Sequence, residues 1–326
     1  MVLDDIVGQR SVVRYIKNIL TGGKVAHAYI FCGPDGVQKS LVANILASAL
    51  NCKEKGNDPC GKCSSCLKAK DGNHPDIINI KTDKNIIHVK EMRELQKDML
   101  KKPYQDGVKV YIIHSADKMN DEAQNCLLKS LEEPPNNVIL ILLVQNQYSM
   151  LKTILSRCQC IKFRRAPERD IKEYLEHKFS VPEGEARCIA ALSNGIVKNA
   201  EEFLNDDVLK KSRDEVINIA RYLYKGDKLK VLSNVDFFIS NKDKIIYIAG
   251  IMTSWFRDIL IYKECMNDKY LINLDKKDII IDESTKFTYN SLNNIINYIN
   301  HTVDNIKSNV NYQLSIEMML LHIQEG

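Results

Sequence analysis

The chain has 326 residues, of which 44% are hydrophobic and 27% charged, and its net charge is +4. This length predicts two or three domains, and the composition is that of a soluble globular protein. The balance of 46 basic against 42 acidic residues argues against a strong, autonomous nucleic-acid binder, so any DNA contact is expected to be local or shared with partners.

No segment of the sequence is typical of export or of a membrane span. The N-terminus lacks a basic stretch followed by an apolar one, so it does not resemble a signal peptide. The longest apolar run, at residues 138–144, is much shorter than the ~20 residues that a membrane-spanning helix needs. We therefore expect a cytoplasmic protein with no membrane partner, in which the ten cysteines do not form a disulfide framework.

Residues 1–165 alternate short apolar runs with patterns of helical period, which predicts an α/β domain with a parallel sheet. The run at 138–144 is apolar throughout, as is typical of a central strand that is buried on both faces. The expected strands cover residues 28–31, 76–80, 109–113, 138–144 and 160–163, and the expected helices cover residues 40–50, 89–99 and 121–133.

The strand signals fade after about residue 165. Helices are expected at 167–178, at 183–192 and from about residue 196, which together indicate a small helical domain over residues 166–207. The pattern over residues 208–326 is almost wholly helical and predicts a C-terminal helical domain, with a break expected near 273–284.

The segment between the first strand and the first helix resembles a phosphate-binding loop. That loop reads G-x-x-x-x-G-K-[ST], and residues 33–40 read GPDGVQKS. Gln38 stands where the pattern has its second glycine. Because phosphates are cradled by backbone N–H groups at close range, a side chain at this position is expected to crowd the phosphate or tilt the loop. The retained candidate residues of the loop are Gly33, Gly36, Lys39 and Ser40.

Four cysteines with the spacing C-x7-C-x2-C-x2-C point to a metal module at residues 52–66. Four thiolates fill the tetrahedral shell of a structural Zn²⁺ and leave no open position for catalysis. His74 is an alternative ligand, although a structural role fits it better because four thiolates already suffice. The other six cysteines show no ligand spacing and are interpreted as small buried residues. The expected zinc ligands are Cys52, Cys60, Cys63 and Cys66.

The strand at 109–113 is not followed by the carboxylates that a P-loop ATPase needs. An acidic residue at the end of a later strand holds the magnesium ion in such enzymes, but here His114 and Ser115 follow the strand. Neither side chain replaces a carboxylate, and Asp117 lies too far along the chain. The retained Lys-Ser pair of the loop leaves nucleotide binding open, whereas ATP hydrolysis by this chain is not expected.

Several strings along the chain resemble the bacterial clamp-loader ATPases, which are AAA+ proteins. The resemblance covers nearly the whole chain and is weak between residues 208 and 305. It implies an AAA+ P-loop domain at 1–165, a small lid domain at 166–207 and an oligomerising collar domain at 208–326. The strings are DIVGQ at 5–9, HAY at 27–29, ADKM at 116–119, LLKSLEEPP at 127–135, SRC at 156–158 and NYQLSIE at 311–317.

The resemblance also implies a function in DNA replication. Motor subunits of the tau/gamma type have an intact phosphate loop and an Asp-Glu pair, so the two defects of this chain match a non-motor member of the family. Such a subunit assembles with the tau/gamma and delta subunits into a hetero-oligomer of the DNA polymerase III holoenzyme, a DNA-directed DNA polymerase. The assembled complex loads the sliding clamp onto primed DNA, with ATP bound by the neighbouring subunits.

The arginine of the SRC string, Arg157, is the candidate catalytic residue. In the family this arginine reaches across a subunit interface to the γ-phosphate of ATP bound by the neighbour. An arginine supplied in trans stabilises the charge that develops on the transferred phosphoryl group. The alternative for Arg157 is a surface arginine that follows a helix. The lid of AAA+ proteins often adds a further arginine in a G-x-x-R-like string, but this chain has Lys198 there, and a solvated position at a helix start fits it better.

Two other functions stay open on the sequence alone. The first is an active ATPase of the tau/gamma type whose loop has diverged, and magnesium-dependent ATP turnover by the isolated chain would favour it. The second is a zinc-containing DNA-binding module unrelated to ATP. The nearly balanced charge and the lack of a basic stripe with interleaved aromatic residues argue against this module.

Overall fold

The structure, a computed structural model, divides the chain into two compact units. The first unit comprises Met1–Ile171 and Gly195–Lys198, and the second comprises Lys172–Asn194 and Asn199–Gly326. The three domains expected from the sequence, with boundaries near 165 and 207, remain a prediction. The described residues are 2–22, 24–82, 86–105, 107–205, 207–224, 234–308 and 310–325, so parts of the helical pattern expected over 208–326, at 225–233, 309 and 326, lie outside them.

The first unit is built on a five-stranded sheet in the order β2-β3-β4-β1-β5, in which every neighbouring pair is parallel. This confirms the α/β class, and the expected strands agree with the observed ones to within one residue at each end. β3 and β4 are buried along their whole length, which explains their unbroken apolar patterns. The strands are β1 (Ala28–Cys32), β2 (Ile77–Ile80), β3 (Lys109–Ile113), β4 (Val138–Val144) and β5 (Gln159–Lys162).

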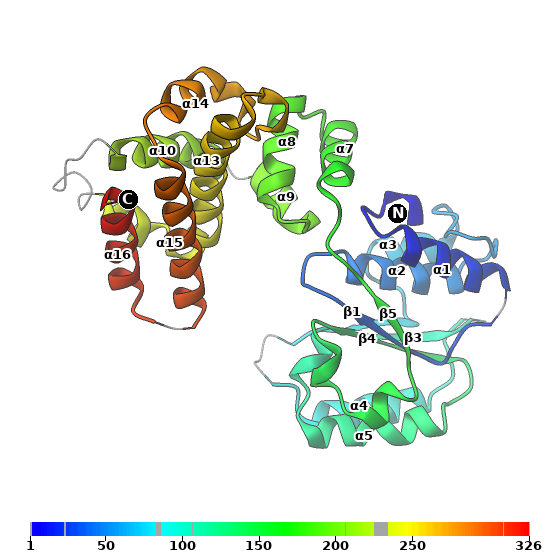
Figure 1. Ribbon diagram of the computed structural model, residues 1–326. Helices are drawn as coiled ribbons and strands as arrows, with labels where there is room; N and C mark the ends of the chain where they lie inside the picture. The colour runs from blue at the N-terminus through cyan, green and yellow to red at the C-terminus, as the bar shows by residue number, and fades with distance from the viewer. Residues whose placement is uncertain are drawn as a thin grey trace. The chain divides into compact units, whose positions relative to one another are not determined.

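Helices cover both faces of this sheet and make three layers (Figure 1). Side chains alternate along each strand, so Val110 and Ile112 of β3 join the core under one helical layer, whereas Tyr111 and Ile113 join the other. One layer holds α1 and α2, and the other holds α4, α5 and α6. The helices of the unit are α1 (Arg10–Gly22), α2 (Lys39–Leu50), α3 (Ser64–Lys70), α4 (Val89–Met99), α5 (Asp121–Glu132) and α6 (Lys152–Leu155), with 3-10 turns at Leu3–Asp5, Ala116–Lys118 and Gln147–Ser149.

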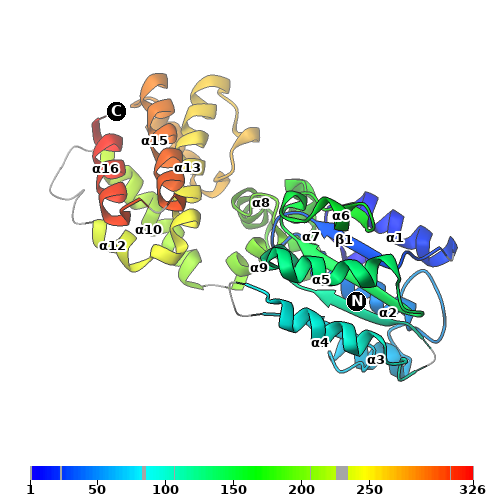
Figure 2. The ribbon, with the colours of Figure 1, turned by 90° about the horizontal axis from the view of Figure 1, so that it is seen from below.

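The second unit is helical, and α7 and α9 cross the boundary between the two units. Figure 2 shows α10, α13, α15 and α16 gathered in one bundle, in which α13 packs against both α10 and α15. The helices of this part of the chain are α7 (Glu168–Phe179), α8 (Glu183–Leu192), α9 (Val197–Asn205), α10 (Asp207–Tyr224), α12 (Val235–Ser240), α13 (Ile245–Cys265), α14 (Lys277–Ser284), α15 (Tyr289–Lys307) and α16 (Tyr312–Glu325), with 3-10 turns at Lys242–Lys244, Asp268–Tyr270 and Leu274–Lys276.

Helix α13 is the central helix of this bundle. Among the described residues, the stretch Lys242–Cys265 is the one helical segment long and apolar enough to cross a membrane, and 56% of its apolar window is buried inside the protein. Trp255 and Phe256 of α13 are buried almost completely. The apolar character of α13 is therefore explained by its place in the core of the bundle.

The break expected near 273–284 was partly wrong, because most of that segment is helical. The chain leaves α13 at Cys265 and passes through two 3-10 turns, and α14 then begins at Lys277. The run of three isoleucines at 279–281 lowers the intrinsic helix propensity of α14. Burial of Ile280 supplies the tertiary packing that stabilises a short helix in spite of its propensity.

An ion pair between a buried lysine and a partly exposed aspartate fixes the start of β3 to α4. Lys109, the first residue of β3, has a side chain that is only 3% exposed, and its Nζ lies 2.8 Å from Oδ2 of Asp98. The Tyr111 hydroxyl donates a second hydrogen bond of 2.8 Å to the same carboxylate oxygen. The hydrogen bond from Lys109 is the main cause that lowers the pKa of Asp98 to about 2. Asp98 therefore stays ionised and compensates the charge of a lysine that is shielded from water.

We expect Asp98→Asn to lower the free energy of unfolding by about 1–3 kcal/mol, because the substitution leaves the buried Lys109 ammonium without its anion. The folded-state pKa of Asp98 lies below the usual value of ~3.9, so the ion pair stabilises the fold above about pH 4 and this contribution is lost as the pH falls toward 2. Urea unfolding of both proteins at pH 7 and at steps below pH 4 measures this difference.

Lys101→Met is the matched control, because Lys101 lies 3.1 Å from the other oxygen of Asp98 but is 72% exposed. Its loss is expected to change the free energy of unfolding by less than about 0.5 kcal/mol. Equal effects of the two substitutions at pH 7 would contradict a special role for the pair of Asp98 with Lys109.

Candidate functional site

The loop of residues 33–38 joins the carboxyl end of β1 to the N-terminus of α2, where phosphate-binding loops lie. Gln38, directly before α2, has a left-handed backbone with φ of 68° and ψ of 20°. Glycine adopts this conformation freely, whereas for a residue with a Cβ the conformation is about 1–2 kcal/mol less favourable. The Gln38 side chain also has a bonding partner, because its Oε1 accepts the backbone N–H of Val7 at 2.9 Å. Gln38 thus ties the N-terminal segment to the loop.

Lys39 is turned back into its own loop. Its Nζ donates to the carbonyl oxygen of Gly33 and, at 3.0 Å, to that of Pro34, and it lies 3.4 Å from Oδ1 of Asp35. The Lys39 side chain is only 7% exposed. All three ammonium protons of this lysine therefore have acceptors from the loop itself, in the place where a working P-loop lysine binds phosphate oxygens.

Asp35 brings a negative charge into the loop. Its side chain is 69% exposed, and its second oxygen accepts a hydrogen bond from Nε2 of Gln145, the residue that follows β4. A carboxylate in this position repels a phosphate and competes with it for Lys39. This contact was not predicted, because Asp35 lies in the loop before α2, where helical i, i+4 spacing does not apply.

The segment Gly195–Lys198 lies directly on the loop. Gly36 has a φ of +80°, and a Cβ added to it would lie 2.5 Å from Cγ2 of Ile196 and 2.9 Å from Cβ of Lys198. The backbone N–H of Lys198 donates to the Gly36 carbonyl oxygen at 3.2 Å. The Lys198 side chain is exposed, as expected for a lysine at a helix start. This close approach requires glycine at position 36 for a packing reason, apart from any phosphate.

A polar network occupies the region beside the loop where a magnesium ion would lie. Nε2 of His114 donates to Oδ1 of Asn79 at 2.8 Å, and Nδ2 of Asn79 donates to Oδ1 of Asn44 at 3.1 Å. Nδ2 of Asn44 in turn lies 2.8 Å from the Ser40 carbonyl oxygen and 3.5 Å from its hydroxyl oxygen. Burial and, to a smaller extent, Lys81 lower the pKa of His114, which favours its neutral form. These four residues provide no carboxylate for a magnesium ion.

Ser115 and Asp117, which follow His114 closely, do not add a magnesium ligand to this network. Ser115 has a left-handed backbone with a φ of 49°, and Asp117 belongs to the 3-10 turn that follows. Oδ1 of Asp117 is buried and has no hydrogen-bond partner in the described part of the chain. Asn44 and Asn79 were not predicted, because their meeting with His114 depends on the packing of α2 against β2 and β3.

Arg157 lies at the opposite edge of the sheet from the loop. It is two residues before β5, and β5 runs parallel to β1 with Gln159 opposite Tyr29. The loop follows the carboxyl end of β1, whereas Arg157 precedes the amino end of β5. At ~3.3 Å per residue, the length of these strands separates the two by roughly 15 Å. The structure therefore brings the loop and the His114 network together but keeps Arg157 away from them.

The guanidinium of Arg157 is held on the surface near the end of α6. Its side chain is 36% exposed, and one terminal nitrogen lies 2.8 Å from Oε1 of Glu132. The other terminal nitrogen donates to the Thr153 carbonyl oxygen at 3.0 Å and to the Ser156 hydroxyl at 3.2 Å. These contacts orient the arginine while leaving it accessible.

The four cysteines of the predicted metal module converge. Their sulfurs all lie within 4.8 Å of one another, and those of Cys60 and Cys66 are 3.9 Å apart. A tetrahedral zinc ion with Zn–S bonds of ~2.3 Å places its sulfurs about 3.8 Å apart, so this donor set fits zinc in number, type and spacing. Cys63 is the N-cap residue of α3, and Cys66 lies in the first turn of that helix.

Backbone N–H groups surround the sulfurs. The N–H groups of Cys60, Cys63 and Cys66 point at the sulfurs of Cys52, Cys60 and Cys63, at 3.3–3.4 Å. Burial opposes ionisation of Cys63, but hydrogen bonds from the backbone N–H groups of Lys53 and Cys66, together with those from the side chains of Cys66 and Cys60, outweigh it and lower the pKa of Cys63 to about 6. Burial raises the pKa of Cys66. These N–H groups stabilise the thiolate form that binds metal.

His74 supports the module without being one of its clustered ligands. Its Nδ1 accepts the Asp76 N–H at 3.1 Å, and its Nε2 lies 3.0 Å from the Ser65 hydroxyl of α3. The side chain is 4% exposed, and burial lowers the pKa of His74. Both ring nitrogens are engaged, as expected for a structural histidine.

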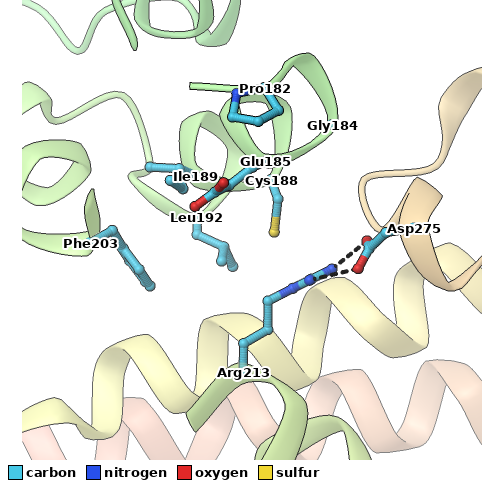
Figure 3. A pocket seen from close by; sticks show the side chains of 9 residues that line it. All are labelled: Pro182, Gly184, Glu185, Cys188, Ile189, Leu192, Phe203, Arg213 and Asp275. Atoms are coloured by element: carbon cyan, nitrogen blue, oxygen red, sulfur yellow. Dashed lines mark hydrogen bonds and ion pairs between the residues drawn. The ribbon is translucent and has the colours of Figure 1, made fainter. Parts of the chain in front are cut away.

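The second unit contains a cavity of about 420 Å³ that no sequence motif indicates (Figure 3). Arg213 reaches it from α10 and binds both oxygens of Asp275 at 2.8 and 2.9 Å. The hydrogen bonds from Arg213 lower the pKa of Asp275. The lining residues are Pro182, Gly184, Glu185, Cys188, Ile189, Leu192, Phe203, Arg213 and Asp275.

Comparison with known proteins identifies relatives along both units. Residues 8–167 match the family model described as DNA polymerase III, delta subunit, and residues 209–325 match the model of its C-terminal part. DNA polymerase III subunit delta′ of Bacillus subtilis is 31% identical over 324 residues, which are 98% of this chain and 97% of that protein.

The tau subunits are also similar but are longer. Tau of Bacillus subtilis is 32% identical over 282 residues, which are 80% of this chain and 50% of that protein. Tau of Escherichia coli is 35% identical over 175 residues, which are 53% of this chain and 27% of that protein. The chain spans about half or less of these tau subunits but nearly all of its delta′ relative. On the identity and coverage of that relative, the chain belongs to the family of DNA polymerase III delta′ subunits.

Proposed function

We propose that this chain is a non-motor subunit of the bacterial replicative clamp loader, which assembles with motor subunits to load the sliding clamp on primed DNA. Membership of the delta′ family supports a role in clamp loading during DNA replication. The proposed partners are the tau/gamma and delta subunits and, through the assembled complex, the clamp and the DNA. The proposed place of action is the cytoplasm.

The observation that carries the proposal is the division of the ATP machinery between the two edges of one sheet. The phosphate loop at one edge has its own Lys39 bound within it, and the polar network described beside it, from Ser40 to His114, contains no carboxylate for magnesium. Arg157, at the other edge, is accessible and lies well away from that loop. An arginine in this position suits a nucleotide that a second subunit presents, where it stabilises the charge on the transferred phosphoryl group.

The phosphate loop is proposed to be catalytically silent. Binding of ATP there would require Lys39 to leave three acceptors and the triphosphate to lie beside Asp35. Hydrolysis would further require a magnesium ligand that His114 does not provide. The residues that would hold a weakly bound nucleotide are Gly33, Gly36, Lys39 and Ser40.

Cys52, Cys60, Cys63 and Cys66 are proposed to hold one structural Zn²⁺. Zinc bound there would cross-link the end of α2 to α3 and so stabilise the insertion between α2 and β2. Four thiolates complete the shell, so the metal has no open position for substrate.

The isolated chain is expected to show no magnesium-dependent ATP turnover above background. Gln38→Gly alone is expected not to create turnover, because Lys39 stays paired with Asp35 and no carboxylate is added near His114. Release of labelled phosphate from ATP, with a tau/gamma motor subunit as the positive control, measures this. Turnover by the wild-type chain would favour the alternative of an active tau/gamma-type ATPase.

Arg157→Ala is expected to slow ATP hydrolysis by the reconstituted loader severalfold or more, because the ATP site of the neighbouring subunit loses the arginine that this chain supplies. The fold is expected to stay intact. The DNA-stimulated ATPase rate and the thermal midpoint of the isolated variant are the two measurements. Arg10→Ala is the matched control, because Arg10 is an arginine of the same unit whose side chain is 84% exposed. An ATPase rate that Arg157→Ala leaves unchanged would rule out the trans role.

Gently purified protein is expected to contain about one zinc ion per chain, with four thiols protected from a thiol reagent until a chelator is added. Elemental analysis and thiol titration measure the two quantities. Cys60→Ser should lower both the zinc content and the thermal midpoint, whereas Cys265→Ser should change neither, because Cys265 is exposed and lies in the other unit. Protein with almost no metal and four freely titrating thiols would overturn the zinc assignment.

A further inference from the structure

Arg157 is held by groups from two separate elements before any partner is present. Glu132, the last residue of α5, binds one terminal nitrogen of the guanidinium at 2.8 Å. The Thr153 carbonyl and the Ser156 hydroxyl, from α6 and the turn after it, bind the other terminal nitrogen. Glu132 is the charged member of this set, so it sets the electrostatic preference of the arginine.

The ion pair with Glu132 is of a kind that a stronger anion displaces. The side chains of Glu132 and Arg157 are 50% and 36% exposed. Exposed pairs contribute little to stability and weaken in salt. A terminal phosphate carries more charge than a carboxylate and offers more acceptor oxygens to a guanidinium. A phosphate would therefore displace Glu132 from the guanidinium of Arg157.

Glu132 and a phosphate cannot share this guanidinium without a cost. Two anions on neighbouring nitrogens of one arginine lie a few ångströms apart, where like charges repel each other. Thr153 and Ser156 offer neutral oxygens, so they do not oppose a phosphate in this way. The competition is thus confined to Glu132.

We propose that Glu132 is a positioning residue that holds Arg157 against α5 until the phosphate of a nucleotide on a neighbouring subunit displaces it. This inference rests on the trans role proposed for Arg157. The arginine must leave Glu132 before it can bind the phosphate. Breaking this ion pair therefore makes the binding of ATP at the neighbouring subunit less favourable. Glu132 therefore sets how much ATP is needed to engage Arg157 and does not set the rate of the chemical step.

The test is a double-mutant cycle in the reconstituted loader. Glu132→Gln is expected to lower the KM for ATP by about 1.5-fold to fivefold, the factor that corresponds to an exposed ion pair, and to leave kcat within about twofold. The decrease should shrink at 0.5 M salt, where exposed pairs are screened. In the Arg157→Ala background, Glu132→Gln should have no further effect on KM or kcat.

Glu133→Ala is the matched control, because Glu133 is the next residue, is also exposed and carries the same charge. It is expected to leave KM unchanged, which separates the pair with Arg157 from a general change in surface charge. The thermal midpoint of each isolated variant checks that the fold is retained.

The double-mutant cycle distinguishes the trans role of Arg157 from the positioning role of Glu132. If Arg157→Ala slows the loader but Glu132→Gln leaves KM unchanged or raises it, the trans role stands and the role of Glu132 is wrong. An effect of Glu132→Gln that persists without Arg157 would falsify the positioning role, since it would then act on packing. If Arg157→Ala itself changes nothing, both proposals fail.

Discussion

The parallel pairing of β1 with β5 is the constraint on which the arrangement of this protein depends. Parallel strands bring their carboxyl ends to one edge of the sheet and their amino ends to the other. The loop that follows β1 and the arginine that precedes β5 therefore lie at opposite edges. One subunit of this build cannot bring its own arginine to its own loop, but two subunits placed edge to edge can combine one arginine with one loop. This geometry is the reason that the trans role proposed for Arg157 requires a second subunit.

The degenerate loop remains ordered because internal partners replace what a nucleotide would supply. Buried donors and acceptors have to be paired, and here Lys39 is paired within the loop, Gln38 with Val7, and the Gly36 carbonyl with the Lys198 N–H. These bonds join the loop to the N-terminal segment and to the segment Gly195–Lys198. Lys39 therefore has a structural reason to be present, apart from any nucleotide.

The sequence predicted the parts that depend on local pattern. β3 and β4 read as unbroken apolar runs because both of their faces are buried, and the cysteine spacing alone indicated a cluster. The network from Ser40 to His114 could not be predicted, because it joins side chains from elements that are far apart in the chain. The helix α14 was missed because burial of Ile280 outweighs a poor local propensity. The sequence pattern indicated which strands are buried and which cysteines cluster. It did not predict contacts that depend on tertiary packing.

Burial decides which ion pairs of this chain are permanent and which can exchange partners. The Lys109 side chain is 3% exposed. If it separated from Asp98, its ammonium group would be left unpaired in an environment that solvates charge poorly. Arg157 is 36% exposed, and water replaces Glu132 at little cost when the pair opens. Both pairs have nitrogen–oxygen distances of 2.8 Å, so the distance alone does not distinguish them. The first pair fixes a strand to a helix, whereas the second can open and suits the exchange of partners that is proposed for Arg157.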